Sequence, residues 1–155
     1  MFPAARRRAP SRNFRYTIDA SVFVNAFNRH ERGHAESLQI LAAIQARGDP
    51  IIVPTLLIAE IASSVARAAD DTIGAVKYVN ATAALPHLTL VSLTSVVAGR
   101  AAELAASHRL RGADAVYLEV ARRYGTTLIL RDDEQLTRGS GLVVCQTPEA
   151  ALSDR

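Results

Sequence analysis

Four acidic residues are the part of this sequence best suited to chemistry: Asp19, Glu60, Asp114 and Asp133. Carboxylates that converge in one cleft repel one another, so they either shift their pKa values or share cations. Hard ions such as Mg²⁺ and Mn²⁺ prefer oxygen ligands, and the scattered histidines and the single cysteine give no zinc pattern. Such a site suits phosphate chemistry, because a bound ion screens a phosphodiester and activates a water.

Each acid taken alone also has an ordinary structural explanation. Glu60 could be a surface glutamate on the polar side of a helix that also carries Ser64 and Arg67. Asp114 could complement the macrodipole of the helix that it opens. Asp19 could cap a short helix. Only the set of acids, read by position, indicates a functional site.

Short apolar runs alternate with helical patterns along the chain. Strands are expected at 14–18, 51–53, 88–93, 127–130 and 142–146. Helices are expected at 21–28, 33–47, 56–69, 72–84, 95–107 and 112–124, with caps at Thr55, Thr94 and Gly125. Strands separated by helices predict an α/β fold with a mainly parallel sheet covered on both faces. Ligands bind such sheets beyond the carboxyl ends of the strands, which is where Asp19 and Asp133 follow the first and fourth strands.

Length and charge indicate one globular domain with a basic N-terminal segment. The chain has 155 residues, with 18 Lys and Arg against 15 Asp and Glu. Five of the arginines lie in the first fifteen residues, so the rest of the chain is slightly acidic. Residues 1–13 are expected to be a disordered, arginine-rich leader, and residues 14–150 a single domain. The longest apolar region, 51–69, is interrupted by charge and proline, so we expect a cytoplasmic protein without a membrane span.

Four pieces of sequence occur in the order and at the spacing of a known family. They are Ile18-Asp19-Ala20-Ser21, Pro54 with Leu57-Ile58-Ala59-Glu60-Ile61, Leu110-Arg111-Gly112-Ala113-Asp114-Ala115, and Leu128-Ile129-Leu130 leading to Asp133-Glu134-Gln135-Leu136. With these pieces the sequence resembles PIN-domain ribonucleases, and most closely the VapC-type toxins of VapBC toxin–antitoxin pairs. The resemblance extends over residues 14–146.

The resemblance implies a three-layer α/β/α fold with a four- to five-stranded sheet. It also implies a metal-dependent endoribonuclease that uses Mg²⁺ or Mn²⁺ to cut single-stranded or looped RNA. The implied partners are a second copy of the chain, in a homodimer, and a small antitoxin protein that blocks the cleft. By this resemblance Asp19, Glu60, Asp114 and Asp133 are the catalytic and metal-binding residues, and Ser21 is the small polar residue that orients the first carboxylate.

Two positions depart from the pattern of the family. Arg131 stands where the family usually has Ser or Thr, two residues before the last acid. Asp132 lies beside Asp133, and strand alternation allows only one of them to face the cleft; the register of Leu136 favours Asp133. Three arginines beside the matched acids either contact phosphates or are solvated: Arg109, Arg111 and Arg131.

Other functional classes fit less well. A phosphoaspartate enzyme of the haloacid dehalogenase type needs a second acid two residues after the first-strand Asp, where this chain has Ser21. A response-regulator receiver needs a lysine after its fifth strand, whereas the single lysine, Lys77, lies in the middle of the chain. A catalytically weak domain that binds RNA or an antitoxin remains an alternative, and it differs from a nuclease in that its RNA binding does not depend on metal.

Overall fold

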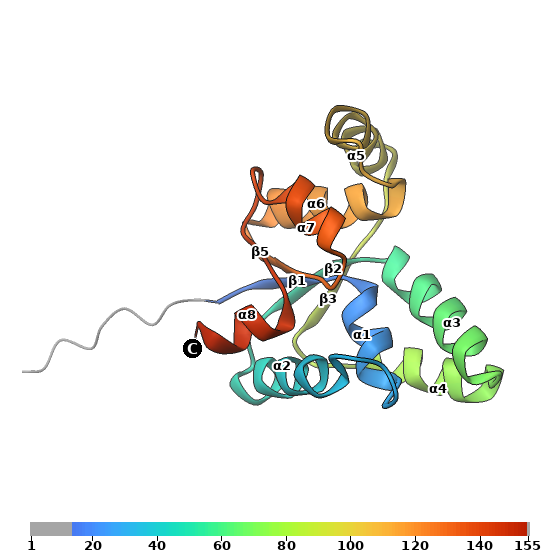
Figure 1. The fold of residues 1–155 in the computed structure, drawn as a ribbon. Coiled ribbons are helices and arrows are strands. Elements are labelled where there is room, and N and C mark those ends of the chain that lie inside the picture. The colour runs from blue at the N-terminus through green and yellow to red at the C-terminus, as the bar shows by residue number, and fades with distance from the viewer. Residues whose placement is uncertain (1–13, 155) are drawn as a thin grey trace, which may run out of the picture.

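The computed structural model describes residues 14–154, so the predicted leader at 1–13 lies outside the described residues. Residues 14–154 form five strands and eight helices (Figure 1). In chain order they are β1 (Tyr16–Ile18), α1 (Ala20–Phe27), α2 (His34–Arg47), β2 (Ile51–Pro54), α3 (Leu56–Ala69), α4 (Thr72–Ala83), β3 (Leu88–Val91), α5 (Ser95–His108), α6 (Gly112–Tyr124), β4 (Thr127–Ile129), α7 (Asp133–Gly139), β5 (Cys145–Gln146) and α8 (Pro148–Ser153). In this part of the chain no helix is both long enough and apolar enough to cross a bilayer.

The five strands form one sheet in the order β3-β2-β1-β4-β5, and every neighbouring pair is parallel. Each crossover between strands contains at least one helix, as parallel strands require. The order runs to one side of β1 through β2 and β3 and to the other through β4 and β5. The strand order therefore reverses between β1 and β4, and in open α/β sheets the crevice at such a switch point is the usual place for a ligand.

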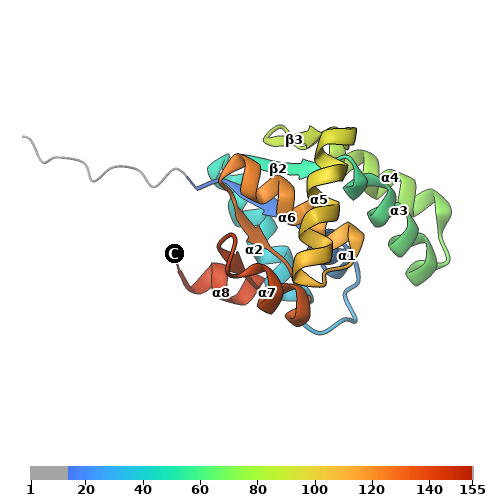
Figure 2. The same ribbon diagram turned by 90° about the horizontal axis from the view of Figure 1, so that it is seen from above.

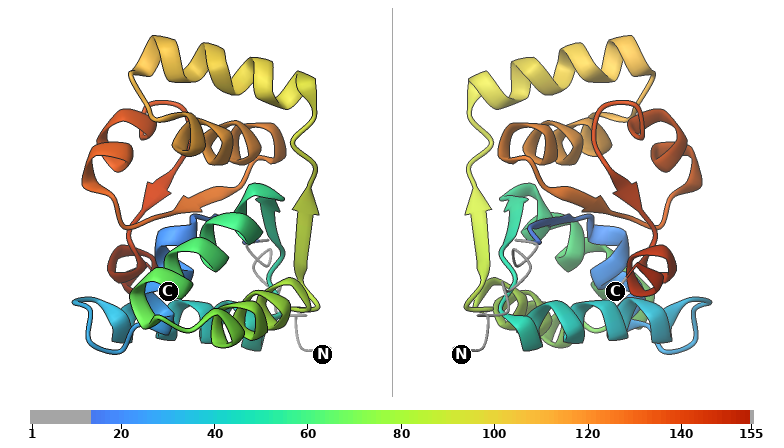
Figure 3. Two further views of the ribbon diagram at one scale, coloured as in Figure 1. Left: turned by 90° about the vertical axis from the view of Figure 1, so that its right-hand side faces the viewer. Right: turned by 90° about the vertical axis from the view of Figure 1, so that its left-hand side faces the viewer.

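Helices cover both faces of the sheet, which confirms the predicted three-layer α/β/α fold. Figures 1 and 3 show α5, α6 and α7 on one side of the sheet and α2, α4 and α8 on the other. Seen from above, α6 crosses directly over the strands (Figure 2). The central strands are buried between these layers, and Ile18, Leu128 and Ile129 have no exposed surface. Buried parallel strands of this kind read as continuous apolar runs, which is the pattern in the sequence.

Local capping residues account for most of the helix boundaries. Thr94 caps α5 by accepting a hydrogen bond from the backbone N–H of Val97, as predicted. Gly125 ends α6 in the left-handed conformation at a φ of 60°, a geometry that glycine adopts without steric strain. Thr55 is the N-cap residue of α3, as predicted, but its side chain makes no capping hydrogen bond to that helix. Its hydroxyl instead accepts a hydrogen bond from the backbone N–H of Leu93, 3.4 Å away.

Two short helices, α7 and α8, were not expected from the sequence. Each contains only two turns or fewer, which is too short for a clear hydrophobic period. Their starts do carry a local signal, because Asp132 caps α7 and Thr147 caps α8 ahead of Pro148. The position of α7 matters for the site, since this helix follows directly after β4 at the switch point.

Candidate active site

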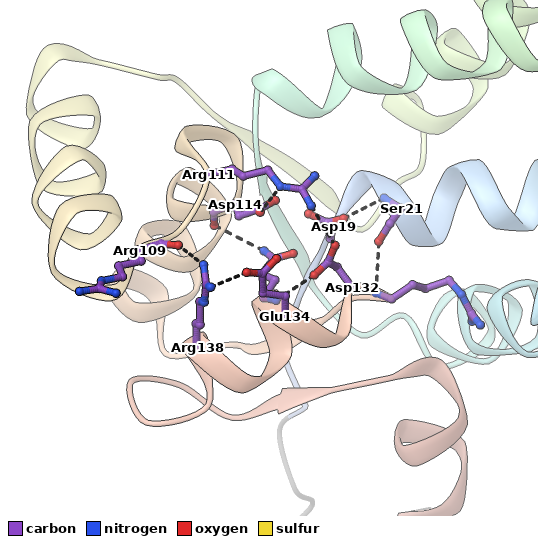
Figure 4. Close-up of polar contacts among 10 residues, drawn as sticks. Asp19, Ser21, Arg109, Arg111, Asp114, Asp132, Glu134 and Arg138 are labelled. Carbon is purple, nitrogen blue, oxygen red and sulfur yellow. Dashed lines mark hydrogen bonds and ion pairs between the residues drawn. The ribbon is translucent and has the colours of Figure 1, made fainter.

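A cleft of about 790 Å³ opens at the carboxyl ends of β1 and β4, at the switch point of the sheet. Its walls come from α1, α3, α6 and the segment that leads into α7. Three of the four predicted acids line it, together with the residue before the fourth: Asp19, Glu60, Asp114 and Asp132. Segments more than one hundred residues apart in sequence thus bring their carboxylates to one place (Figure 4).

Asp19 is the most buried of these acids, with 7% of its surface exposed. It directly follows β1 and caps α1, because its Oδ2 accepts a hydrogen bond of 2.9 Å from the backbone N–H of Ser21. Burial raises the pKa of Asp19, and the nearby charge of Asp132 raises it further, while hydrogen bonds from Ser21 and Gln135 act in the opposite direction. The cap therefore holds a carboxylate rigidly in a place that disfavours its charge.

Glu60 faces the cleft from the second turn of α3. The hydroxyl of Tyr117, a fully buried residue of α6, donates a hydrogen bond of 2.5 Å to Glu60 Oε2. Burial raises the pKa of Glu60, the Tyr117 bond lowers it, and the charges of Asp19 and Asp114 raise it again. The sequence prediction missed Tyr117, although its spacing of three residues from Asp114 places both on one face of α6.

Asp114 lies in the first turn of α6, on the opposite wall from Glu60, and keeps 20% of its side chain exposed. Burial raises the pKa of Asp114 to about 6, and the charge of Asp19 adds to the effect. The guanidinium of Arg111 acts against it, but Arg111 Nε lies 3.9 Å from Asp114 Oδ2, so the pairing is loose. The Asp19, Glu60 and Asp114 carboxylates therefore repel one another. Arg111 is the arginine that lowers the pKa of Asp114, although Arg32, Arg67 and Arg131 also line the cleft.

The fourth of these acids to line the cleft is Asp132, whereas Asp133, the residue favoured by the sequence, is not among the lining residues. Asp132 is extended at a φ of −85° and a ψ of 116°, so its side chain turns back over α7 and accepts a hydrogen bond of 2.9 Å from the backbone N–H of Gln135. Asp133 is the first helical residue and is exposed to solvent. The residue two positions before Asp132 is the buried Leu130, so the small hydroxyl of the family pattern is missing there as well.

The arginines named from the sequence have three different environments. Arg111 is 72% exposed and lies 3.4 Å from Asp132 Oδ2, at the mouth of the cleft. The Arg131 guanidinium instead points to α2 and α8, where it contacts Ser37 and Glu149 at 3.1 Å each. Arg109 is in the left-handed C-cap of α5 and does not line the cleft. Arg111 and Arg131 both line the cleft, but the Arg131 guanidinium is engaged by Ser37 and Glu149, so Arg111 is the better placed to meet a ligand beside the acids.

The backbone of Arg131 also takes part in the site. Its N–H donates a hydrogen bond of 3.2 Å to Ser21 Oγ, and Ser21 in turn contacts the Asp19 carboxylate. The end of β4 and the start of α1 are thereby tied together on either side of Asp19. The contact between Ser21 and the first carboxylate, which the resemblance implied, is present in the structure.

The donor set of the cleft fits an open site for a hard divalent cation. Within residues 14–154, no three His, Cys, Asp or Glu side chains are gathered closely enough to form a closed metal cluster. Mg²⁺ does not need one, because it keeps several waters and is usually bound through one or two carboxylates plus phosphate oxygens of the substrate. The raised pKa values of Asp19, Glu60 and Asp114 mark negative charge that a cation would compensate.

Comparisons with solved structures show the same fold in other proteins. The structure is similar to VapC20 of Mycobacterium tuberculosis, a sarcin–ricin loop cleaving toxin, with a TM-score of 0.69 and 15% identity over 83% of this chain and 96% of that chain. It is also similar to PAE2754 of Pyrobaculum aerophilum, with a TM-score of 0.67 and 17% identity over 92% and 96%. The DNA-bound VapBC2 complex of Rickettsia felis gives a TM-score of 0.66 and 14% identity over 86% and 98%.

Sequence comparison gives two results. No curated protein matches the chain. The family model of the PIN domain, however, matches residues 16–141. This range begins with β1, ends after α7 and includes every acid that lines the cleft. The chain therefore belongs to the PIN-domain family.

Proposed function

We propose that this protein is a metal-dependent endoribonuclease and the toxin of a type II toxin–antitoxin pair. The observation that carries the proposal is the cleft at the switch point, where four carboxylates from separate segments converge and three of them have raised pKa values. Membership of the PIN-domain family supports a nuclease. The similarity to VapC20 and to VapBC complexes supports the toxin role and a looped RNA as substrate.

In this proposal Asp19, Asp114 and Asp132 supply the carboxylates for Mg²⁺ or Mn²⁺, with one or two of them binding the ion directly and the rest acting through its waters. Asp132 takes the role that we expected from the sequence for Asp133. A bound divalent ion would screen the phosphodiester and lower the pKa of an attacking water. Asp19 is suited to a fixed ligand because its cap leaves it little freedom. Asp114 and Asp132 face the cleft from the starts of two other helices, so the three residues surround the place where a phosphate would enter.

Glu60 is suited to handle the proton of the attacking water. Its Oε2 accepts a hydrogen bond from the Tyr117 hydroxyl, which leaves Oε1 without that bond on a residue that lines the cleft. Its pKa is raised toward the pH of the cell, and a general base works most efficiently when its pKa is near the working pH. Glu60 therefore accepts the proton at Oε1 or orients the water through a metal-bound neighbour.

Arg111 is suited to contact a phosphate of the RNA. Its long, exposed contacts with Asp114 and Asp132 are weak compared with a short bidentate pair, so they can be exchanged for a phosphate at small cost. The affinity of an acidic cleft for RNA then comes from bound cations, which reverse the local sign of charge, and from this arginine. The expected products carry 5′-phosphate and 3′-hydroxyl ends.

A cleavage assay on the full chain tests the enzymatic part. A labelled stem-loop RNA is incubated with the wild type in Mn²⁺ and then in EDTA, beside the Asp19→Asn variant. Asparagine caps helices as well as aspartate does, so this variant should keep its fold. We expect cleavage that needs Mn²⁺ and that disappears in Asp19→Asn. RNA binding without cleavage in any divalent ion would instead support the alternative of an RNA-binding or antitoxin-binding domain.

The partners in this proposal are a small antitoxin that blocks the cleft and a second copy of the chain. A short reading frame immediately upstream of the gene, encoding a DNA-binding protein, would support the antitoxin. Co-expression should then give a complex in which cleavage of the stem-loop RNA is suppressed.

Light scattering of the purified chain tests the homodimer, and a monomer at micromolar concentration would contradict it. Retention in the cytoplasm is part of the same proposal, since its RNA substrate is found there.

A further inference from the structure

Gln135 lies in the first turn of α7, has 2% of its surface exposed and lines the cleft. Its backbone N–H donates to Asp132 Oδ1 at 2.9 Å. Its side-chain Nε2 lies 3.5 Å from the backbone carbonyl oxygen of Asp114 and the amide also hydrogen-bonds the Asp19 carboxylate. One buried residue therefore contacts all three residues to which we assign cation binding.

Packing alone does not explain a glutamine at this position. The side-chain oxygen Oε1 is buried and has no hydrogen-bond partner within residues 14–154. A buried polar atom without a partner destabilises the folded state, and an apolar side chain of similar shape would avoid that loss. The amide therefore lowers the stability of the fold at a position where its donors reach residues of the cleft.

The neutral amide has a property that no charged donor shares. A lysine or arginine at this place would pair with Asp19 and compete with a cation for it. The amide of Gln135 presents two N–H donors and carries no charge, so it orients the carboxylate and leaves its negative charge available. Its two acceptors are the Asp19 carboxylate and the Asp114 backbone carbonyl, which lie 95 residues apart in sequence. The amide links these two segments although their carboxylates repel each other.

We propose that Gln135 is a positioning residue that holds Asp19 and the Asp114 backbone in the arrangement that binds the divalent cation. The inference rests on the proposed function for the existence of that cation site. Residues that orient metal ligands through hydrogen bonds typically change metal affinity about 10- to 100-fold when they are replaced. Loss of the amide should therefore weaken cation binding without weakening the fold.

The test compares the wild type with Gln135→Met, in which a side chain of similar length lacks both the donors and the unpaired oxygen. Gln39→Met, at an exposed position of α2, is the matched control. Mn²⁺ binding to the full chain is measured by electron paramagnetic resonance, and thermal unfolding is followed without metal. We expect Gln135→Met to bind Mn²⁺ about 10-fold or more weakly, with a Tm equal to or above that of the wild type.

The dependence of cleavage on Mn²⁺ concentration gives a second readout. Gln135→Met should need about 10-fold more Mn²⁺ for half-maximal cleavage of the stem-loop RNA and should approach the wild-type rate at saturation. Unchanged Mn²⁺ affinity, or a variant that unfolds well below the wild type, would overturn the inference while leaving the proposed function standing. Absence of Mn²⁺ binding in the wild type would overturn both.

Discussion

Helix α6 carries two acids whose surroundings are opposite in kind. Glu119 has no exposed surface, and its Oε2 accepts hydrogen bonds from Arg122 Nε and Nη2 at 3.1 and 2.8 Å. Asp114, five residues earlier, faces other carboxylates, and the nearest arginine nitrogen that pairs with it is 3.9 Å away. The same helix therefore holds a buried acid with its own cation and a half-buried acid with almost none.

The difference separates an acid that serves the fold from one that serves the site. Taking a charge out of water costs free energy, and a close, well-aligned cation recovers part of that loss. At Glu119 the cation is built into the next turn of the helix. At Asp114 the loss is left largely uncompensated, and the consequence is the pKa of about 6. In the proposed function a divalent ion would bind at the cleft and offset part of this loss of stability.

The largest effect is expected for Asp114→Asn. This variant removes a charged ligand, so cleavage in Mn²⁺ should fall by more than the roughly 100-fold typical of residues that only orient ligands. It also removes charge repulsion, so Tm at pH 7.5 should equal or exceed that of the wild type. Cleavage rates test the expected loss of activity, and thermal unfolding tests the expected equal or higher Tm. Full activity, or loss of activity through unfolding, would contradict the assignment.

The second prediction concerns Arg122→Ala. This variant leaves the buried carboxylate of Glu119 without its cation. Because the Arg122 side chain is 43% exposed, the expected loss is smaller than that of a fully buried pair, about 1–2 kcal/mol. Urea unfolding should show a loss of about this size, while Mn²⁺ affinity stays at the wild-type value. Arg123→Ala, at the exposed neighbouring position, is the matched control and should change the unfolding free energy little. If Arg122→Ala and Arg123→Ala changed the unfolding free energy equally, Glu119 would not depend on Arg122 as its cation, and the contrast with Asp114 would fail.

The third prediction is a pH dependence at Asp114. A carboxyl whose pKa is raised in the folded state binds its proton more tightly there than in the unfolded chain. Its contribution to stability is therefore full below about pH 4 and is lost as the pH rises through about 6. The Tm of Asp114→Asn should exceed that of the wild type by a growing margin between pH 4.5 and 7.5, equivalent to about 1–2 kcal/mol.

A bound cation favours the ionised carboxylate, so metal should reverse the loss of stability that Asp114 causes as the pH rises. We expect Mn²⁺ to raise the Tm of the wild type at pH 7.5 by more than at pH 4.5, and to leave Asp114→Asn nearly unchanged. Scanning calorimetry with and without the ion measures both. If the Tm difference between Asp114→Asn and the wild type did not vary with pH, the charge of Asp114 would already be compensated by other groups of the protein.

The smallest effect is expected for Asp133→Asn. Asp133 is exposed and does not line the cleft, so its variant should keep wild-type cleavage and Mn²⁺ affinity. Asp132→Asn is the matched comparison, since asparagine preserves the cap of α7 but removes a charge from the site. Cleavage should fall in this variant. A loss of activity in Asp133→Asn with none in Asp132→Asn would restore the position expected from the sequence.

Much of the fold could be predicted because its signals are local. The helical periods, the cap at Thr94 and the glycine that ends α6 each depend on a few neighbouring residues. Five predicted strands have counterparts in the sheet, although the last is reduced to two residues. The helices α7 and α8 were missed because seven and six residues do not establish a hydrophobic period.

The candidate site was predicted only in part. Asp19, Glu60 and Asp114 meet at the cleft because the order of elements sends the ends of parallel strands to one edge. Tyr117 and Gln135 were missed, since each acts through a partner on another element, and neither residue type marks a site by itself. The choice between Asp132 and Asp133 depended on where α7 begins, and helix boundaries are the least reliable part of a sequence prediction.

The sequence by itself determined the alternation of strands and helices and the places of Asp19, Glu60 and Asp114 along these elements, because periodicity and capping are properties of adjacent residues. The tertiary structure alone decided which carboxylates share the cleft, which arginine reaches them and which buried donors hold them. These contacts join segments up to about 115 residues apart in sequence. The charges of the cleft residues interact only once folding of the sheet has brought these segments close together. The raised pKa values, and the cation that we propose to offset them, are therefore properties of the folded chain.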